Sequence, residues 1–165
     1  MPDRTTFPGE GTLIRVSARH MLKIPREHYD AVRRHAEETY PHECCGVLLG
    51  QIDTQEKIVS SVVRCGNTRS DSPHNRYHID PRELVRVQRE GRERGEDILG
   101  FYHSHPDHSA QWSPTDLAEA HWLGCSYVIT SVEKGKAALT NSFELQGAGE
   151  SDKKLVDEFV EITSP

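Results

Sequence analysis

The chain has 165 residues, of which 35% are hydrophobic and 28% are charged, and its formal net charge is −6. This length and composition predict a soluble globular protein with one domain and a substantial core. The acidic balance argues against nucleic-acid binding, which requires a basic face. No stretch approaches the roughly 20 apolar residues needed to span a bilayer, and the N-terminus lacks the apolar core of a signal peptide, so we expect a cytoplasmic protein that contacts no membrane.

The N-terminal part of the chain is expected to hold an extension, a strand and a helix. Residues 1–17 mix Pro, Gly, Thr and charged residues without a period, which predicts a flexible extension ahead of a single domain over residues 18–165. A short strand is expected at 21–24. A helix over residues 25–40 follows, because apolar or aromatic positions recur there at spacings of three and four. Those positions are Tyr29, Val32, Ala36 and Tyr40.

The middle of the chain combines a hairpin, a polar loop and a second helix. Two apolar runs at 44–52 and 56–64 flank a short polar turn, which predicts a β-hairpin. Residues 67–75 are polar and rich in turn formers, so we expect an exposed loop, followed by a short strand at 76–79. A helix is expected after Asp80, which is a good N-cap followed by proline at the first helical position. Its inward-facing residues are expected to be Leu84, Val85 and Val87.

The C-terminal half alternates strands with one further helix. Strands are expected at 97–103, 126–132 and 136–145, with the last two joined as a hairpin, and a helix is expected at 114–122. The run at 154–162 fits both a helical stripe and a strand, so both assignments stay open. Strands interleaved with helices predict an α/β architecture, although the order of the strands does not follow from the sequence.

Two histidines stand one residue apart at the end of an apolar run, in Gly100-Phe-Tyr-His-Ser-His-Pro106. Residues i and i+2 of a strand point the same way, so the imidazoles of His103 and His105 would project side by side. Asp116, in the first turn of the helix expected after them, can add a carboxylate. Two histidines and one carboxylate form a three-ligand zinc set with one position open for water, which is the arrangement of catalytic rather than structural zinc.

A catalytic zinc site also needs a general base, and Glu43 is the best candidate. It directly precedes a short apolar run of the buried-strand type, so it sits at the entrance of another strand. Each of these residues also has an ordinary structural interpretation. Ser113 and Asp116 are spaced nearly as a capping box, which needs no metal, and Glu43 by itself would be a surface carboxylate. The combination of all these groups favours a zinc hydrolase.

The four cysteines follow neither a disulfide framework nor a CxxC zinc pattern. They are Cys44, Cys45, Cys65 and Cys125. The adjacent pair would face opposite sides of a strand and cannot easily form a bridge. We therefore expect small buried thiols, as in a reducing cytosol.

The site residues resemble the signature of the JAMM (MPN+) metallopeptidases, which is an upstream Glu, then His-x-His-Pro, six residues, Ser, two residues and Asp. In this chain the signature reads Glu43, then His103-Ser-His105-Pro106, six residues ending at Trp112, Ser113, Pro-Thr and Asp116. The match is complete in residue type and spacing. The similarity covers about residues 20–145 and includes the segments Pro41–Gly50, Arg76–Pro81 and Tyr127–Ser131. The chain looks most like the small, single-domain bacterial branch of the family.

The resemblance implies an MPN fold related to that of the cytidine deaminases, with a mixed, curved sheet packed between helices. It implies that His103, His105 and Asp116 bind one Zn²⁺ ion together with a catalytic water. Glu43 would accept the proton of that water and pass it to the leaving amine, and Ser113 would donate a hydrogen bond to the water or the developing oxyanion. Family members cut peptide or isopeptide bonds after the Gly-Gly end of ubiquitin-like proteins. Small bacterial members are associated with ubiquitin-like sulfur carriers, so we expect such a carrier as the partner of this protease.

Two other functions compete with this interpretation. A non-catalytic MPN-type module would bind a ubiquitin-like tail without cutting it, but it has no use for an open zinc site. A zinc deaminase would need a His/Cys/Cys ligand set with a Pro-Cys-x-x-Cys element, which the chain lacks.

One departure from the family pattern is Trp112, where many relatives have Pro, and the indole either lines the tail groove or packs. Polyubiquitin is not the expected substrate, and both a monomer and a homodimer remain open.

Overall fold

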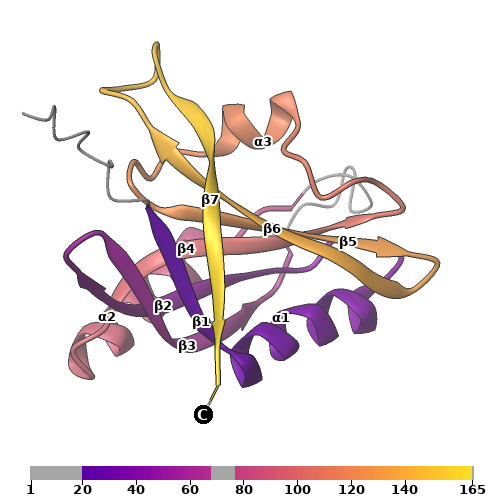
Figure 1. The fold of residues 1–165 in the computed structure, drawn as a ribbon, viewed down its shortest axis with the longest axis horizontal. Helices are drawn as coiled ribbons and strands as arrows, with labels where there is room; N and C mark the ends of the chain where they lie inside the picture. Colours follow the sequence, from indigo (N-terminus) through magenta and orange to yellow (C-terminus); the bar gives the residue numbers. More distant parts are fainter. Residues whose placement is uncertain (1–19, 68–76, 165) are drawn as a thin grey trace, which may run out of the picture.

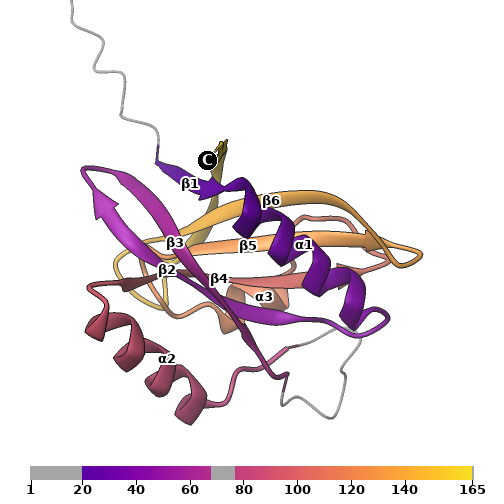
Figure 2. The same cartoon turned by 90° about the horizontal axis from the view of Figure 1, so that it is seen from below.

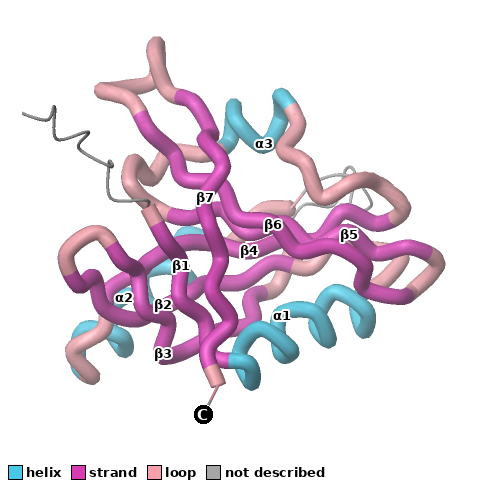
Figure 3. Tube along the Cα trace, viewed as in Figure 1, coloured by secondary structure: helices cyan, strands magenta, loops and turns pink. Residues whose placement is uncertain are grey.

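The computed structural model describes residues 20–67 and 77–164, in which strands make up the largest share (Figure 3). In chain order the elements are β1 (Met21–Pro25), α1 (Arg26–Thr39), β2 (Cys45–Asp53), β3 (Glu56–Cys65), α2 (Pro81–Glu93), β4 (Asp97–Pro106), α3 (Pro114–Glu119), β5 (Ser126–Glu133), β6 (Lys136–Gln146) and β7 (Lys154–Thr163) (Figure 1). Within the described ranges, no helix has both the length and the apolar character required to cross a membrane. The extension predicted at 1–17 and almost all of the loop predicted at 67–75 lie outside the described residues.

The strands form one mixed sheet in the order β1-β3-β2-β4-β5-β6-β7, and this sheet closes on itself. The short strand β1 completes the closure, because it pairs in parallel with β3 on one side and with β7 on the other. β4 and β5 also run parallel, whereas the other neighbouring strands are antiparallel. The predicted α/β class and mixed sheet are confirmed. The curvature is stronger than predicted, since it brings the two edges of the sheet together at β1.

The two faces of the sheet carry separate apolar cores. Leu48 packs in one core and its neighbours Val47 and Leu49 pack in the other, as expected for consecutive residues of a strand. α1 buries Ala36 in the core that contains Leu48, and α2 contributes Val87 to the other. The two helices therefore cover opposite faces of the sheet (Figure 2).

Two predicted elements differ from the structure. The strand predicted at 76–79 is wrong, because residues 77–79 have no regular secondary structure and Tyr77 packs against the apolar core instead of pairing along the sheet. The helix predicted at 114–122 is too long. α3 ends at Glu119, since Ala120 adopts an extended backbone and buries its side chain.

The burial pattern corrects one further prediction and settles an open one. Val85 is 54% exposed rather than inward-facing, because the buried face of α2 is centred on Val87 and helical geometry directs position 85 away from it. The ambiguous run at 154–162 is the strand β7, which the closed sheet requires as a partner for β1. The prediction of buried thiols is confirmed, since the four cysteines are free and buried.

A buried ionic cluster ties β3 to three strands that are not its neighbours. The ammonium group of Lys57 donates hydrogen bonds of 2.9 Å to Ser126 Oγ, Glu144 Oε2 and Glu158 Oε2. These bonds use all three of its protons. The side chains of Lys57 and Glu158 are only 7% and 0% exposed. The cluster therefore connects β3 to β5 through a side-chain hydrogen bond, and to β6 and β7 through ion pairs, without backbone pairing.

Replacing Lys57 with Met is expected to lower the free energy of unfolding by about 3–5 kcal/mol, because two buried carboxylates lose their cation. Methionine keeps most of the length of the lysine side chain, so the loss in free energy of unfolding comes mainly from the missing charge and little from an empty cavity. Chemical denaturation measures the difference, with Lys154→Met at an exposed position as the matched control. A Lys57→Met protein as stable as this control would show that the cluster contributes no net stability.

Candidate metal centre

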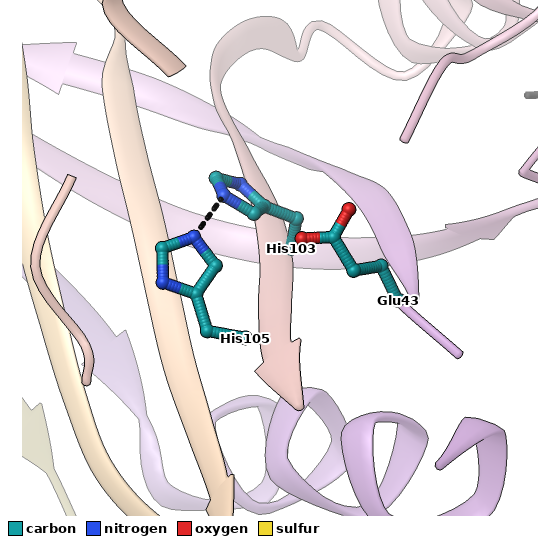
Figure 4. Close-up of side chains that lie close together, drawn as sticks. All are labelled: Glu43, His103 and His105. Carbon is teal, nitrogen blue, oxygen red and sulfur yellow. Dashed lines mark hydrogen bonds between the residues drawn. The ribbon is translucent and has the colours of Figure 1, made fainter. Parts of the chain in front are cut away.

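The C-terminal end of β4 presents two imidazoles on one side of the strand, as the alternation of side chains predicts. His103 and His105 are buried, with exposed fractions of 1% and 9%. Their Nε2 atoms lie 3.2 Å apart, and the two rings face one another across a small space (Figure 4). Two ring nitrogens at this separation can bind a single ion between them.

Asp116, from the first turn of α3, brings a carboxylate to the same two nitrogens. Its Oδ1 lies 3.1 Å from His103 Nε2 and its Oδ2 lies 3.2 Å from His105 Nε2. A tetrahedral zinc ion with bonds of about 2.0–2.1 Å separates its ligand atoms by about 3.3 Å. The distance between the two nitrogens, and the distance from each nitrogen to the Asp116 oxygen that faces it, are all close to this spacing. A set of two imidazoles and one carboxylate suits zinc.

The capping box predicted as the alternative role of this segment is also present. Ser113 N–H donates to Asp116 Oδ2 at 2.8 Å, and Asp116 N–H donates to Ser113 Oγ at 3.1 Å. The cap therefore does not compete with the metal-site interpretation. It holds the carboxylate of Asp116 against the first turn of α3, so that the oxygens facing the histidines are already oriented.

Neighbouring groups also orient the imidazoles. His105 Nδ1 lies 2.7 Å from the backbone carbonyl of Ser109, so this nitrogen is the donor and Nε2 keeps its lone pair for an ion. The ring of Tyr77 stacks on the ring of His103 with 4.4 Å between centroids. His103 Nδ1 is buried and has no hydrogen-bond partner among the described residues, so the Tyr77 stack and the contact of Nε2 with Asp116 restrain this imidazole.

Glu43 reaches the centre from a distant segment of the chain, just before β2. β2 and β4 are antiparallel with Cys45 opposite His103, and continuing this register places Glu43 opposite His105. Glu43 is 3% exposed, and one of its oxygens lies within 4.8 Å of a ring nitrogen of each histidine. In the described part of the chain Glu43 Oε2 has no hydrogen-bond partner, which leaves this atom available to a water molecule or an ion.

The two carboxyl groups of the centre have opposite electrostatic environments. Burial, together with the negative charges of Asp116 and Glu119, raises the pKa of Glu43 to about 9. Burial also acts to raise the pKa of Asp116, but the hydrogen bonds with His103 and His105 outweigh it and hold that pKa well below its usual value. Asp116 is therefore ionised, as a carboxylate must be in order to bind a metal ion, whereas Glu43 can hold a proton. Two carboxyl groups whose pKa values are pushed apart are typical of an acid–base site.

Ser104 lies between the two histidines and, by the alternation of the strand, points to the opposite face of β4. Its hydroxyl accepts a 2.8 Å hydrogen bond from the N–H of Cys44, and its own N–H donates to the carbonyl of Cys44 at 3.3 Å. Because Cys44 directly follows Glu43, these two bonds hold Glu43 beside the histidines.

We expect Ser104→Ala to lower the free energy of unfolding by about 1–3 kcal/mol, because the buried N–H of Cys44 loses its acceptor. Chemical denaturation tests this, and Ser151→Ala, at an exposed position, is the control for removing a serine hydroxyl. Equal stability of the two variants would contradict a structural role for the Ser104 hydroxyl.

An open cleft leads to the centre. Its walls include Glu43, His105, Ser113 and Trp112, and Trp112 is 36% exposed there. Trp112 therefore lines this cleft, and the use of the cleft as a groove for a substrate tail stays a prediction. The remaining lining residues are His108, Ser109, Gln111 and Thr115.

The structure brings the five residues singled out in the sequence into one place. They are Glu43, His103, His105, Ser113 and Asp116. Sequence reasoning missed the supporting groups, namely the ring of Tyr77, the carbonyl of Ser109 and the hydroxyl of Ser104. A backbone carbonyl leaves no signal in a sequence. Tyr77 stands in a segment that resembles the family, which was the only available pointer to its importance.

A family model described as prokaryotic homologs of the JAB domain matches residues 25–146, a range that contains every residue of the centre. The chain belongs to the prokaryotic branch of the JAB (MPN) domain family. The matched range includes all strands except β1 and β7. The JAMM signature of the sequence lies within it.

Curated relatives and a solved structure are similar to this JAB domain over most of its length. Desampylase of Haloferax volcanii is 34% identical over 114 residues, which cover 67% of this chain and 80% of the desampylase. A probable TtuB-protein conjugate cleaving protease of Thermus thermophilus is 31% identical over 119 residues, covering 72% and 76% of the two chains. The solution structure of protein DSY2949 from Desulfitobacterium hafniense matches with a TM-score of 0.75 and 28% identity, over 88% of this chain and 94% of that one.

Proposed function

We propose that this JAB domain is a zinc-dependent metallopeptidase that hydrolyses a peptide or isopeptide bond after the Gly-Gly C-terminus of a ubiquitin-like protein. The observation that carries the proposal is the convergence of His103, His105 and Asp116, whose facing atoms lie 3.1–3.2 Å apart. Glu43 opens onto the same cleft. The relatives support the reaction class, since one is named a desampylase and another a protease that cleaves protein conjugates.

The ligand set is assigned to the two imidazoles and the aspartate. His103 and His105 would bind zinc through Nε2 and Asp116 through a carboxylate oxygen, which leaves one coordination position open. When bound, zinc lowers the pKa of a water molecule and polarises the carbonyl of the scissile bond. The Ser109 carbonyl and the Tyr77 ring keep the imidazoles oriented, and such supporting groups strengthen metal binding.

Proton transfer is assigned to Glu43. Its carboxylate accepts a proton from the attacking water and then donates that proton to the leaving amine. Burial raises the pKa of Glu43 to about 9 where no cation is near it. The charge of a bound zinc ion would favour the ionised form and lower this pKa toward neutral pH, where a carboxyl group can both accept and return a proton.

Ser113 is assigned the stabilisation of the oxyanion. Its Oγ already accepts the N–H of Asp116, so the hydroxyl proton is free to be donated elsewhere. A donor placed on the rigid start of a helix loses little freedom when it binds the developing negative charge.

The proposed substrate is the tail of a ubiquitin-like sulfur carrier. Glycine lacks a Cβ atom, so a Gly-Gly tail can lie extended in a cleft that would exclude bulkier residues. We further propose that residues 18–165 act as a single domain with an MPN fold related to that of the cytidine deaminases, and that the protein works as a monomer or a homodimer.

A cleavage assay tests the proposal directly. Candidate ubiquitin-like proteins encoded in the same genome are fused through Gly-Gly to a reporter protein and incubated with the zinc-loaded enzyme, and the products are weighed by mass spectrometry. We expect cleavage after the second glycine, loss of activity on chelation, and recovery with zinc. Tail binding without cleavage of any fusion by the zinc-loaded enzyme would instead support the non-catalytic binding module.

A further inference from the structure

We infer that Trp112 is a specificity-determining residue, which restricts the residue immediately before the scissile bond to glycine. The inference rests on the proposed function, because it assigns a role within the same cleft. It concerns a position within the six unspecified residues of the signature, where this chain has Trp and many relatives have Pro.

The position of Trp112 places its side chain at the proposed reaction centre. It directly precedes Ser113 in the chain, and it lines the same cleft as Glu43 and His105. A scissile bond held at the proposed metal centre lies close to these groups, and we place the residue before that bond against the indole. Trp112 is 36% exposed, so part of this large residue is accessible, and it is one of the residues that line the cleft.

The segment that carries Trp112 is fixed on both sides. On one side, Ala110 is 2% exposed and its carbonyl accepts a 3.1 Å hydrogen bond from Asn141 Nδ2 of β6. On the other side, the N–H of Ser113 is held by the capping carboxylate of α3 at 2.8 Å. The backbone of Trp112 is thus anchored within two residues in each direction, which limits how far the segment that carries the indole can move away from the cleft.

An aromatic side chain on an anchored segment discriminates between substrate residues by the space that it leaves for them. A glycine backbone can lie flat against it, whereas a residue with a Cβ atom must either displace the indole or move its carbonyl away from the catalytic groups. Pockets discriminate against one additional methyl or methylene group by about 10–200-fold. We therefore expect Trp112 to contribute at least about tenfold to the preference for glycine over alanine.

Competition between two substrates measures this preference. The probes are two reporter fusions of the same ubiquitin-like carrier, one with its Gly-Gly tail and one with Gly-Ala before the scissile bond, mixed in one sample with zinc-loaded enzyme. The ratio of their kcat/KM values does not depend on how much of a variant is folded. Trp112→Ala is expected to reduce the preference for glycine by at least about tenfold, and Trp112→Phe is expected to reduce it less.

Leu139→Ala is the matched control, because Leu139 is an apolar residue that is 65% exposed and lies outside the cleft. It should keep the wild-type preference. An unchanged preference in both Trp112 variants would overturn the inference while leaving the proposed function intact. Loss of all cleavage in both variants with zinc still bound would also overturn it, since a specificity role requires that the glycine fusion is still cut. If wild-type enzyme cuts neither fusion, the proposed function fails and the inference fails with it.

Discussion

Glu43→Gln is expected to retain zinc and to lose turnover, with kcat reduced by about 10²–10⁴-fold. Glutamine has nearly the same shape as glutamate, but its amide cannot accept and return a proton at neutral pH. The three proposed ligands are other residues, so the metal affinity should change little. Cleavage of a Gly-Gly fusion measures the first effect, and elemental analysis of the dialysed protein measures the second.

The matched control for this substitution is Glu93→Gln. Glu93 is exposed near the end of α2 and lies outside the cleft that contains Glu43. Both variants lose one carboxylate, so they have the same net charge. A difference in turnover between them therefore depends on which carboxylate was removed. Wild-type turnover by Glu43→Gln would show that another group is the base.

Asp116→Asn is expected to lose zinc during dialysis while the protein stays folded. An asparagine side-chain oxygen can still accept the N–H of Ser113, so the cap of α3 is kept, but the negative charge that faces both imidazoles is gone. Loss of an outer partner of a metal ligand costs about 10–100-fold in affinity, and loss of the anionic ligand itself should exceed this range. Zinc content by elemental analysis and folding by circular dichroism are the two measurements.

Ser113→Ala separates the metal-binding role of this segment from its capping role. It removes the hydroxyl that caps the N–H of Asp116 and leaves the carboxylate in place. We expect this variant to lose about 0.5–2 kcal/mol of stability and to keep its zinc. Equal retention of zinc by Asp116→Asn and Ser113→Ala would rule out Asp116 as a ligand.

Local sequence determines much of the candidate site. His103 and His105 share one side of β4 because side chains alternate along any strand. Asp116 is presented by the first turn of α3 because Ser113 and Pro114 define where that helix begins. These statements need only spacing and residue type, and both held in the structure.

Pairing between distant segments determines the rest. Glu43 stands 60 residues before His103 in the chain, and only the antiparallel register of β2 with β4 brings it to the histidines. Tyr77 was predicted to lie in a short strand, but in the structure its ring stacks on His103 and its backbone pairs with no strand. Val85 is a different case, because helical spacing alone directs it away from the buried face that is centred on Val87.

The sequence by itself therefore determined most of the elements, the α/β class and the local geometry of two histidines and one capped aspartate. The tertiary structure alone decided that β1 would close the sheet between β3 and β7, that Glu43 and Trp112 would line one cleft, and that Tyr77 would stack on His103. The physical reason is the range of the interactions. Side-chain alternation and helix capping act over a few residues, whereas strand register and burial depend on which surfaces remain available after the whole chain has folded.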